Sequence, residues 1–560
     1  MQPQSVDMKH KVLFFLYLTV LILPNIILCV TETMPWYGKA TLLLLPLSVY
    51  WTVMCMSHRP SKAYWCLFPV LFLGAFNIVL SYLFGKGVIA VDMWLNVATS
   101  SPNEAGEMLA QLYPSVIAVV IIYVPTLAYA AYDIRSKGRM DHVFVKRQRM
   151  VACALAAAAL PLTGATMATG KWSLLDDLFP VNVCYNLKLA VERQATSLKY
   201  LENSRDFSFD ATCMDADSVP QVLVLVIGET SRAANWQILG YDRETNPELS
   251  KTDGIIAFRD CLSQSNATHK SVPILLSPAT AEDFKVLFHS KGLLAAFREA
   301  GYHTAFISNE PRNHSFNDHL GEQADTTIFL RDSMSGDPKD SLMLPYVSEL
   351  LAGKVNRHQL IVLHTYGSHS TYSDRYEDYQ SHFRPDNVVH ATASCREVLI
   401  NAYDNTIRLT DHFLASVIRM LEQSGRPSAL VYTSDHGEDI YDDERGLYLH
   451  ASPWPSYYQL HTPLIFWFST GYRDLYGQRT GLVAKRRNDP VQSDCIFPTM
   501  LTLGGIGTKV CQDSLSLASK AYRIKQQRHY LTDHNLSVTL DKCLEPQDFV
   551  QLRKRNMRPY

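Results

Sequence analysis

Hydrophobic residues are distributed unevenly: long apolar runs dominate the chain up to about residue 170, and short apolar runs alternate with polar segments after it. A helix needs roughly 20 predominantly apolar residues to cross a bilayer. The runs that approach this length are residues 12–30, 38–57, 64–84, 114–132 and 150–169. None has a charge at its centre, although Lys39 lies near one end of the second run. The pattern predicts a five-helix transmembrane domain over residues 1–170.

The order and charge of the loops predict how these spans are oriented. Lys9 and Lys11 precede the first run, which could therefore be a cleaved signal peptide, but no small-x-small cleavage site follows and more spans come after it. Lysine and arginine are concentrated in loops 58–63 and 133–149, which we expect on the cytoplasmic side. Loop 85–113 is acidic and belongs outside. With five spans, everything after residue 170 is also outside.

The remaining chain predicts a connector and an α/β domain. Residues 171–219 form the connector, and their amphipathic stretch 182–203 lies either along the membrane surface or against the folded domain. From residue 220 to 560, buried-type strands alternate with helical segments, as in a sheet covered by helices. The predicted strands are 222–227, 303–307, 359–363, 429–432 and 463–468, and the predicted helices are 291–300, 342–352 and 396–424.

Charge and cysteine content narrow the possible functions. The net charge of −2 does not indicate the concentrated basic surface that nucleic-acid binding requires, so we expect no nucleic-acid partner. Seven cysteines follow residue 170, in a compartment where disulfides persist. Because seven is odd, at least one of them stays unpaired or pairs between chains.

Ligand-type side chains follow three of the predicted strands. In open α/β sheets, functional groups gather beyond the carboxyl ends of strands. These side chains are Glu229 and Thr230 after strand 222–227, His364 and His369 after strand 359–363, and Asp435 and His436, with His450 further on, after strand 429–432. Asp, His and Glu together can bind a divalent cation. We therefore predict Glu229, Asp435 and His436 as metal ligands.

Several separate sequence blocks resemble the phosphoethanolamine transferases of Gram-negative envelopes, which include lipid A and colistin-resistance enzymes. The blocks are VLVLVIGETSR, GYDRETNP, NATHKSVP, LHTYGSH, NAYDN and SDHGE with YLH, and they lie between about residues 220 and 450. Their order and spacing match the family, as do the five predicted spans. The resemblance implies a multi-pass protein of the bacterial inner membrane with a periplasmic, alkaline-phosphatase or sulfatase-like α/β catalytic domain.

The resemblance also implies roles for individual residues. Thr268 would be the nucleophile, although Thr230 is a rival from the residues alone. Thr268 would join Glu229, Asp435 and His436 around one Zn²⁺ ion. His369 and His450, with His364 near them, would line the substrate side. In the external loop, Asn96, Ser100 and Glu104 fall at helical spacing on one face, which either approaches the lipid head group or is a solvated surface.

The resemblance implies transfer of phosphoethanolamine from phosphatidylethanolamine, through a phosphothreonine, to lipopolysaccharide or another envelope glycan. Membrane lipids are therefore also expected partners. Phosphoglycerol chemistry and transfer to a periplasmic glucan remain alternatives. Two departures from the family surround the acceptor side. Cys261 stands where the family often has the first cysteine of a disulfide, but Ile274 occupies the position of its expected partner, so that bridge should be absent. His269 and Lys270 also differ from the lipid A enzymes. Lipid A phosphate, Kdo, heptose and glucan therefore all stay open as acceptors.

Overall fold

The computed structural model describes residues 3–559 except for residues 33, 85–88, 100–101, 136–138, 171, 216–218, 335, 354–356, 389–390 and 511. The side chains of residues 3–7, 80–84, 96–99 and 102–112 are also outside the description. The chain divides into two compact units, residues 1–94 with 102–191, and residues 95–101 with 192–560. The domain limits predicted at residues 170 and 219 stay predictions.

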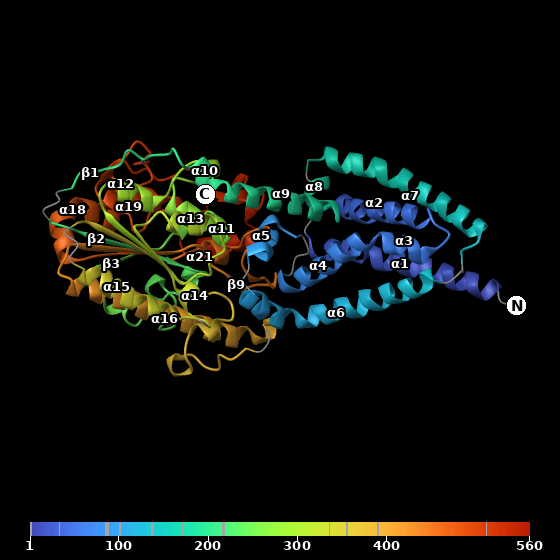
Figure 1. Ribbon diagram of the computed structural model, residues 1–560, viewed down its shortest axis with the longest axis horizontal. Helices are drawn as coiled ribbons and strands as arrows, with labels where there is room; N and C mark the ends of the chain where they lie inside the picture. The colour runs from blue at the N-terminus through green and yellow to red at the C-terminus, as the bar shows by residue number, and fades with distance from the viewer. Residues whose placement is uncertain are drawn as a thin grey trace. The chain divides into compact units, whose positions relative to one another are not determined.

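The first unit is built from helices. They are α1 (Pro3–Thr31), α2 (Trp36–Met54), α3 (Pro60–Cys66), α4 (Phe68–Phe84), the start of α5 (Val91–Thr99), α6 (Pro102–Ile134), α7 (His142–Ala168), α8 (Leu174–Asp177) and most of α9 (Val181–Leu198). Helix α1 packs on α2, α3 and α4, α7 packs on α2, and α6 packs on α3 and α4 (Figure 1). In the core of this unit the rings of Tyr17 and Tyr64 stack with centroids 4.1 Å apart.

The helices of this unit correspond to the predicted spans with two differences. Within the described residues, three segments are long and apolar enough to cross a membrane: Met8–Thr31, Tyr113–Ile134 and His142–Ala168. The predicted third span is broken after α3, where Pro60–Cys66 and Phe68–Val79 meet at 65°, and this pair would make a fourth span. The predicted second span is α2, which does not reach the same apolarity because it contains Lys39 and several hydroxyl side chains.

A seven-stranded sheet forms the centre of the second unit. Its strands are β2 (Val222–Gly228), β3 (Ile255–Phe258), β5 (His303–Ser308), β6 (Thr326–Phe329), β7 (Gln359–His364), β8 (Ser428–Ser434) and β11 (Leu464–Phe468), in the spatial order β3-β11-β8-β2-β7-β5-β6. Strands β8, β2, β7, β5 and β6 run parallel, whereas β11 is antiparallel to both neighbours. All five predicted strands are present. The parallel run brings the ends of β8, β2, β7 and β5 to one edge.

Helices cover both faces of this sheet, as predicted from its uninterrupted apolar strands. Helices α12 (Leu293–Glu299) and α19 (Ile496–Leu503) lie over one face, and α15 (Leu344–Ala352) and α16 (Arg396–Gln423) over the other (Figure 1). Alternate residues of β2, such as Leu223 and Leu225, join Phe297 of α12 and Leu501 of α19 in one core. The three helices predicted by periodicity are therefore confirmed as α12, α15 and α16.

The other elements of this unit are short or peripheral. The helices are α10 (Tyr200–Asn203), α11 (Thr268–Leu276), α13 (Phe316–Gly321), α14 (Leu330–Ser333), α17 (Tyr457–Leu460), α18 (Thr470–Lys485), α20 (Leu540–Cys543) and α21 (Pro546–Lys554). The strands are β1 (Thr212–Cys213), β4 (Cys261–Leu262), β9 (Asp439–Ile440), β10 (Tyr448–Leu449), β12 (Val491–Gln492), β13 (Ile506–Gly507), β14 (His529–Leu531) and β15 (Ser537–Thr539). The amphipathic stretch predicted over residues 182–203 is α9 and α10.

Candidate active site

The carboxyl ends of β2 and β8 bring the predicted metal ligands together. Glu229 follows β2, and Asp435 and His436 follow β8, the direct neighbour of β2. His436 Nε2 lies 3.1 Å from Asp435 Oδ2 and 3.6 Å from Glu229 Oε1, and all three side chains are buried. The three strand-end residues therefore form one cluster, which their sequence separation of more than 200 residues does not show by itself.

Thr268 completes this cluster from a separate element. It is the first residue of α11, whose preceding Ala267 has no side chain that could cap the helix. Its Oγ1 lies 3.3 Å from each carboxylate oxygen of Glu229 and 3.1 Å from His436 Nε2. Unlike the three buried side chains, Thr268 is only partly buried. Its hydroxyl therefore lies between the cluster and an open side.

Burial and like charge set the ionisation of the cluster. The pKa of Glu229 is raised well above its usual value by burial, and then by the nearby carboxylates of Asp435 and Glu310. Burial also raises the pKa of Asp435, while burial and then His450 lower the pKa of His436 well below normal. A neutral imidazole does not offset the negative charge of the carboxylates around it. The neutral form is, however, the one in which His binds a metal.

The rival nucleophile Thr230 is held differently from Thr268. It is fully buried, and its Oγ1 donates to Glu229 Oε1 at 2.6 Å. Its backbone has φ of 60°, an uncommon conformation for a β-branched residue. The backbone N–H donates to Asp435 Oδ1 at 3.2 Å, so this strained turn positions both carboxylates. These contacts favour Thr230 as a positioning residue and leave Thr268 as the accessible hydroxyl.

The three predicted histidines occupy different places around the cluster. The His450 ring lies 4.3 Å from that of His436, and its Nδ1 is 2.9 Å from Glu438 Oε2. The His369 ring is stacked on Tyr366 and lies 6.3 Å from His450. Burial, and then Arg375, lower the pKa of His369 well below normal, so this imidazole is neutral. One grouping of potential ligand atoms, Glu229, His436 and His450, places His450 close enough to reach a metal.

Two acidic residues that are not among the predicted site residues lie beside the cluster. Glu438 accepts from the hydroxyl of Tyr372 as well as contacting His450, and it orients that ring. Glu310 follows β5 and lies with Glu229 and His364 in a second grouping of potential ligand atoms. Glu438 could have been predicted because it belongs to the S-D-H-G-E block. Glu310 could not, because only the order of the strands brings it close to Glu229.

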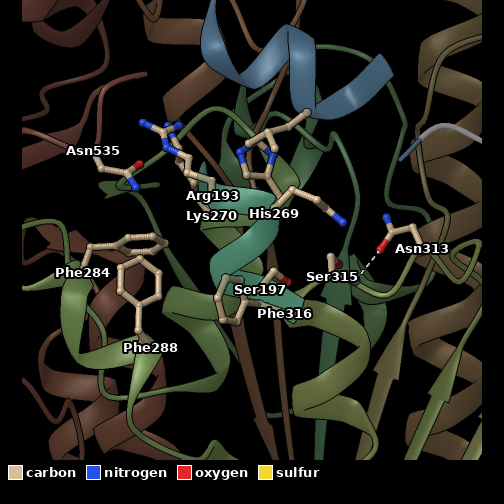
Figure 2. A pocket seen from close by; sticks show the side chains of 12 residues that line it. Arg193, Ser197, His269, Lys270, Phe284, Phe288, Asn313, Ser315, Phe316 and Asn535 are labelled. Carbon is tan, nitrogen blue, oxygen red and sulfur yellow. Dashed lines mark hydrogen bonds between the residues drawn. The ribbon is translucent and has the colours of Figure 1, made fainter. Parts of the chain in front are cut away.

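A pocket opens beside the residues that follow Thr268 (Figure 2). Basic side chains line one part of it, and three phenylalanines form an aromatic wall: the lining includes Arg193, His269, Lys270, Phe284, Phe288 and Phe316. Lys270 Nζ donates to the carbonyl of Thr532 at 2.9 Å, and Arg193 donates to the carbonyl of Asp533 at 2.5 Å. The pocket therefore combines basic side chains with a mainly apolar, aromatic surface, and its lining includes the two residues that directly follow the candidate nucleophile.

Two further predictions concern residues away from the cluster. Asn96 lies in α5 and Glu104 in α6. The side chains of these two residues, and the whole of Ser100, are outside the described part of the chain. That the three residues share one helical face therefore stays a prediction. Cys261 is a buried free thiol, as expected from Ile274 at the position of the family's second cysteine. All the cysteines that the structure describes are free.

Comparison with known proteins identifies the second unit. The sulfatase family matches residues 221–506, just over half of the chain. The phosphoethanolamine transferase EptA of Escherichia coli is 31% identical over 324 residues, which cover 56% of this chain and 58% of that protein. The Kdo(2)-lipid A phosphoethanolamine 7''-transferase of Salmonella typhimurium is 25% identical over 293 residues, covering 50% of each chain. The matches thus span between half and three fifths of these curated relatives.

Solved structures extend the similarity to the helices. The soluble domain of lipooligosaccharide phosphoethanolamine transferase A from Neisseria meningitidis is 30% identical and covers 56% of this chain and 97% of its own, with a TM-score of 0.51. The integral membrane form of that transferase is 23% identical, covers 90% of this chain and 97% of its own, and gives 0.68. The periplasmic domain of EptC from E. coli, solved in complex with Zn, is 22% identical. It covers 60% of this chain and 97% of its own, with a TM-score of 0.54.

The chain belongs to the sulfatase family, and its matches place it with the phosphoethanolamine transferases of that family. The predicted fold class, an N-terminal helical membrane region followed by a sulfatase-like α/β domain, is confirmed. Ahead of the sulfatase-like domain, the described residues include three helices that are long and apolar enough to cross a membrane.

Proposed function

We propose that this protein transfers phosphoethanolamine from phosphatidylethanolamine to an envelope glycolipid of the lipopolysaccharide type, with Thr268 as the nucleophile. The observation that carries the proposal is the position of Thr268 Oγ1, 3.1 Å from His436 Nε2 and 3.3 Å from both oxygens of Glu229. A hydroxyl is a weak nucleophile unless its surroundings activate it. The relatives supply the group transferred, since their names specify phosphoethanolamine.

The cluster fits a zinc ion in both chemistry and spacing. Four ligands at ~2.0 Å from a tetrahedral zinc lie roughly 3.3 Å from one another. The separations between ligand atoms of Glu229, Asp435, His436 and Thr268 are 3.1, 3.3 and 3.6 Å. These four residues would hold the ion, and the periplasmic domain of EptC, which is similar in fold, was solved in complex with Zn. When bound, zinc favours the deprotonated threonine hydroxyl and offsets the negative charge of a phosphate group.

The reaction proceeds in two displacements at phosphorus. In the first, Thr268 Oγ1 forms a bond to the phosphorus of phosphatidylethanolamine, the bond from phosphorus to the glycerol oxygen breaks, and diacylglycerol leaves with a proton. In the second, an acceptor oxygen attacks the phosphothreonine and frees Thr268. His450 is placed to exchange the proton, because Glu438 holds its Nδ1 at 2.9 Å and leaves Nε2 for the substrate.

The pocket beside Thr268 supports an amphiphilic, anionic acceptor. Its basic residues Arg193, His269 and Lys270 suit a phosphate or carboxylate group, and its phenylalanines suit an apolar or ring-shaped surface. Such a combination fits a phosphorylated or acidic glycolipid better than a neutral glucan. Among the acceptors left open by the sequence, lipid A phosphate and Kdo carry this charge.

The test is to express the wild type, Thr268→Ala and Thr268→Ser in a Gram-negative host and to analyse the envelope glycolipids by mass spectrometry. We expect phosphoethanolamine additions with the wild type, at least a ~10³-fold reduction with Thr268→Ala, and partial activity with Thr268→Ser, which keeps a hydroxyl. The modified glycan identifies the acceptor. Full transfer by a membrane-inserted Thr268→Ala protein would refute the assignment of the nucleophile.

A further inference from the structure

Two ligand-type side chains lie on the side of Glu229 that the first cluster does not use. They are Glu310 and His364, and one potential ligand atom from each of Glu229, Glu310 and His364 lies within 4.8 Å of the others. Neither Glu310 nor His364 is part of the set formed by Asp435, His436 and Thr268. The second group thus shares Glu229 with the first and otherwise uses different residues.

The order of the strands explains how this group forms. Strand β7 lies between β2 and β5, and all three run parallel. His364 ends β7, opposite Ile227 of β2 on one side and Ser308 of β5 on the other. Glu229 and Glu310 each lie two residues beyond these positions. The geometry is built on three paired strands, so the two carboxylates flank the imidazole on a rigid support.

His364 has the properties of a ligand rather than of a core residue. The residue is 1% exposed, and among the described residues its Nε2 is buried without a hydrogen-bond partner. A buried nitrogen without a partner destabilises the fold, and a bound cation would offset this cost.

The charges near Glu229 also exceed what one divalent ion can balance. Glu229, Asp435 and Glu310 bring three carboxylates together: Glu229 shares one grouping with Glu310, and Glu229 and Asp435 lie 3.6 and 3.1 Å from His436 Nε2. One divalent cation offsets two of these charges and leaves one beside the position of an incoming phosphate, itself an anion. A further cation on the Glu310 side would offset the remaining carboxylate before the anionic substrate enters.

We propose that Glu229, Glu310 and His364 form a second divalent-cation site, next to the zinc site of the proposed function on which this inference rests, with Glu229 shared as a bridging carboxylate. Two carboxylates and one imidazole suit a first-row cation such as Zn²⁺ or Mn²⁺. Paired metal sites of this kind lie roughly 3.5–4 Å apart and stabilise the attacking and leaving oxygens of a phosphoryl group.

The experiment measures cation stoichiometry on the full chain in detergent. The wild type, Glu310→Gln and His364→Gln are loaded with Zn²⁺ or Mn²⁺ alone, freed of excess, and analysed for metal per chain, with Mn²⁺ followed by electron paramagnetic resonance. Glu244→Gln, which changes an exposed glutamate, is the matched control. We expect two cations in the wild type and the control, with a spin-coupled Mn²⁺ signal. Each of the two site variants should lose one cation and the coupling, and keep the wild-type circular dichroism spectrum.

The outcomes separate this inference from the proposed function. One cation per wild-type chain, unchanged in both variants and accompanied by transferase activity, would overturn the second site and leave the proposed function standing. If the wild type bound no cation and transferred nothing, both proposals would fall. If His364→Gln alone were misfolded, Glu310→Gln would still decide the stoichiometry, because its side chain keeps nearly the same volume.

Discussion

Buried carboxylates occur in both units, and their surroundings differ. Asp133 in the helical unit lies 3.3 Å from Lys9 Nζ, 3.4 Å from His10 Nε2 and accepts from Ser61 Oγ at 2.7 Å. Glu229 in the sulfatase domain lies beside two further carboxylates, and within the described residues its ion-pair partner is His436, which burial keeps neutral. The charge of Asp133 is thus balanced by groups inside the fold. The charge of Glu229 is not balanced by its neutral partner His436, and a bound cation would balance it.

This difference distinguishes a structural buried charge from a functional one. Taking an ion out of water costs several kcal/mol unless it is paired. A fold that keeps an uncompensated carboxylate cluster is therefore destabilised locally, and the usual reason is ligand binding. The comparison predicts that neutralising the two carboxylates changes stability in opposite directions.

Of the changes that test this comparison, Glu229→Gln has the largest expected effect, and that effect is on activity. Glutamine keeps the shape of the side chain but not its charge, so the cation site is lost and transfer should fall by more than ~100-fold, beyond the loss typical of an indirect metal contact. At a pH where both carboxylates are ionised, the metal-free variant should at the same time be more heat-stable than metal-free wild type, because carboxylate repulsion with Asp435 is removed. Activity is measured by glycolipid mass spectrometry and stability by thermal unfolding with chelator present.

Exchange of Glu244, an exposed glutamate, for glutamine serves as the control and should leave both quantities unchanged. A Glu229→Gln protein that is less stable than the wild type when both are metal-free would contradict the view that this carboxylate is uncompensated.

The second effect is a pH dependence that appears only without metal. The pKa values of Glu229 and Asp435 are raised in the folded protein, so it holds protons that the unfolded chain has released. This contribution to stability is complete below the unfolded values, about 4 for such groups, and is lost as pH rises through the raised values. We expect the unfolding temperature of chelated protein to fall with rising pH, and the stabilisation by added Zn²⁺ to grow. A gap between the two forms that shrinks with pH would argue against ionised carboxylate ligands.

The smallest expected effect is the loss of stability in Asp133→Asn. This change removes the anion that faces Lys9 and His10 while keeping a group that can bond to Ser61. Because Lys9 is 41% exposed and can be solvated, we expect a cost of only about 1 kcal/mol in the free energy of unfolding. Thermal unfolding in detergent measures it. Transferase activity of the folded variant should be retained, and a large loss would make Asp133 more than a structural charge.

The sequence predicted the centre of the sheet well and its edges poorly. The runs of β2, β7 and β8 are continuously apolar because both of their faces are covered, and such runs are easily recognised. Strands β3 and β6 were missed because they are short and mostly half-buried, as edge strands are. The broken third span was missed because hydropathy reports composition and not the bend after Cys66.

The same limit applies to the site. Glu229, Asp435, His436 and Thr268 were predicted because polar residues directly after strands, and a family resemblance, single them out. Glu310 follows β5, and nothing local distinguishes it from a surface glutamate. Its proximity to Glu229 depends on β7 lying between their strands, which is a property of the topology and not of spacing along the chain.

The most direct test of the central claim is to detect the covalent intermediate on Thr268. Purified wild type, Thr268→Ala and Thr268→Ser are incubated with phosphatidylethanolamine without acceptor, digested and analysed by peptide mass spectrometry. We predict that the peptide containing Thr268 gains one phosphoethanolamine group, that the gain maps to this residue, that the serine variant retains it in part, and that the alanine variant lacks it. A modified Thr230, or an unmodified Thr268 in protein that is active when acceptor is added, would contradict the account.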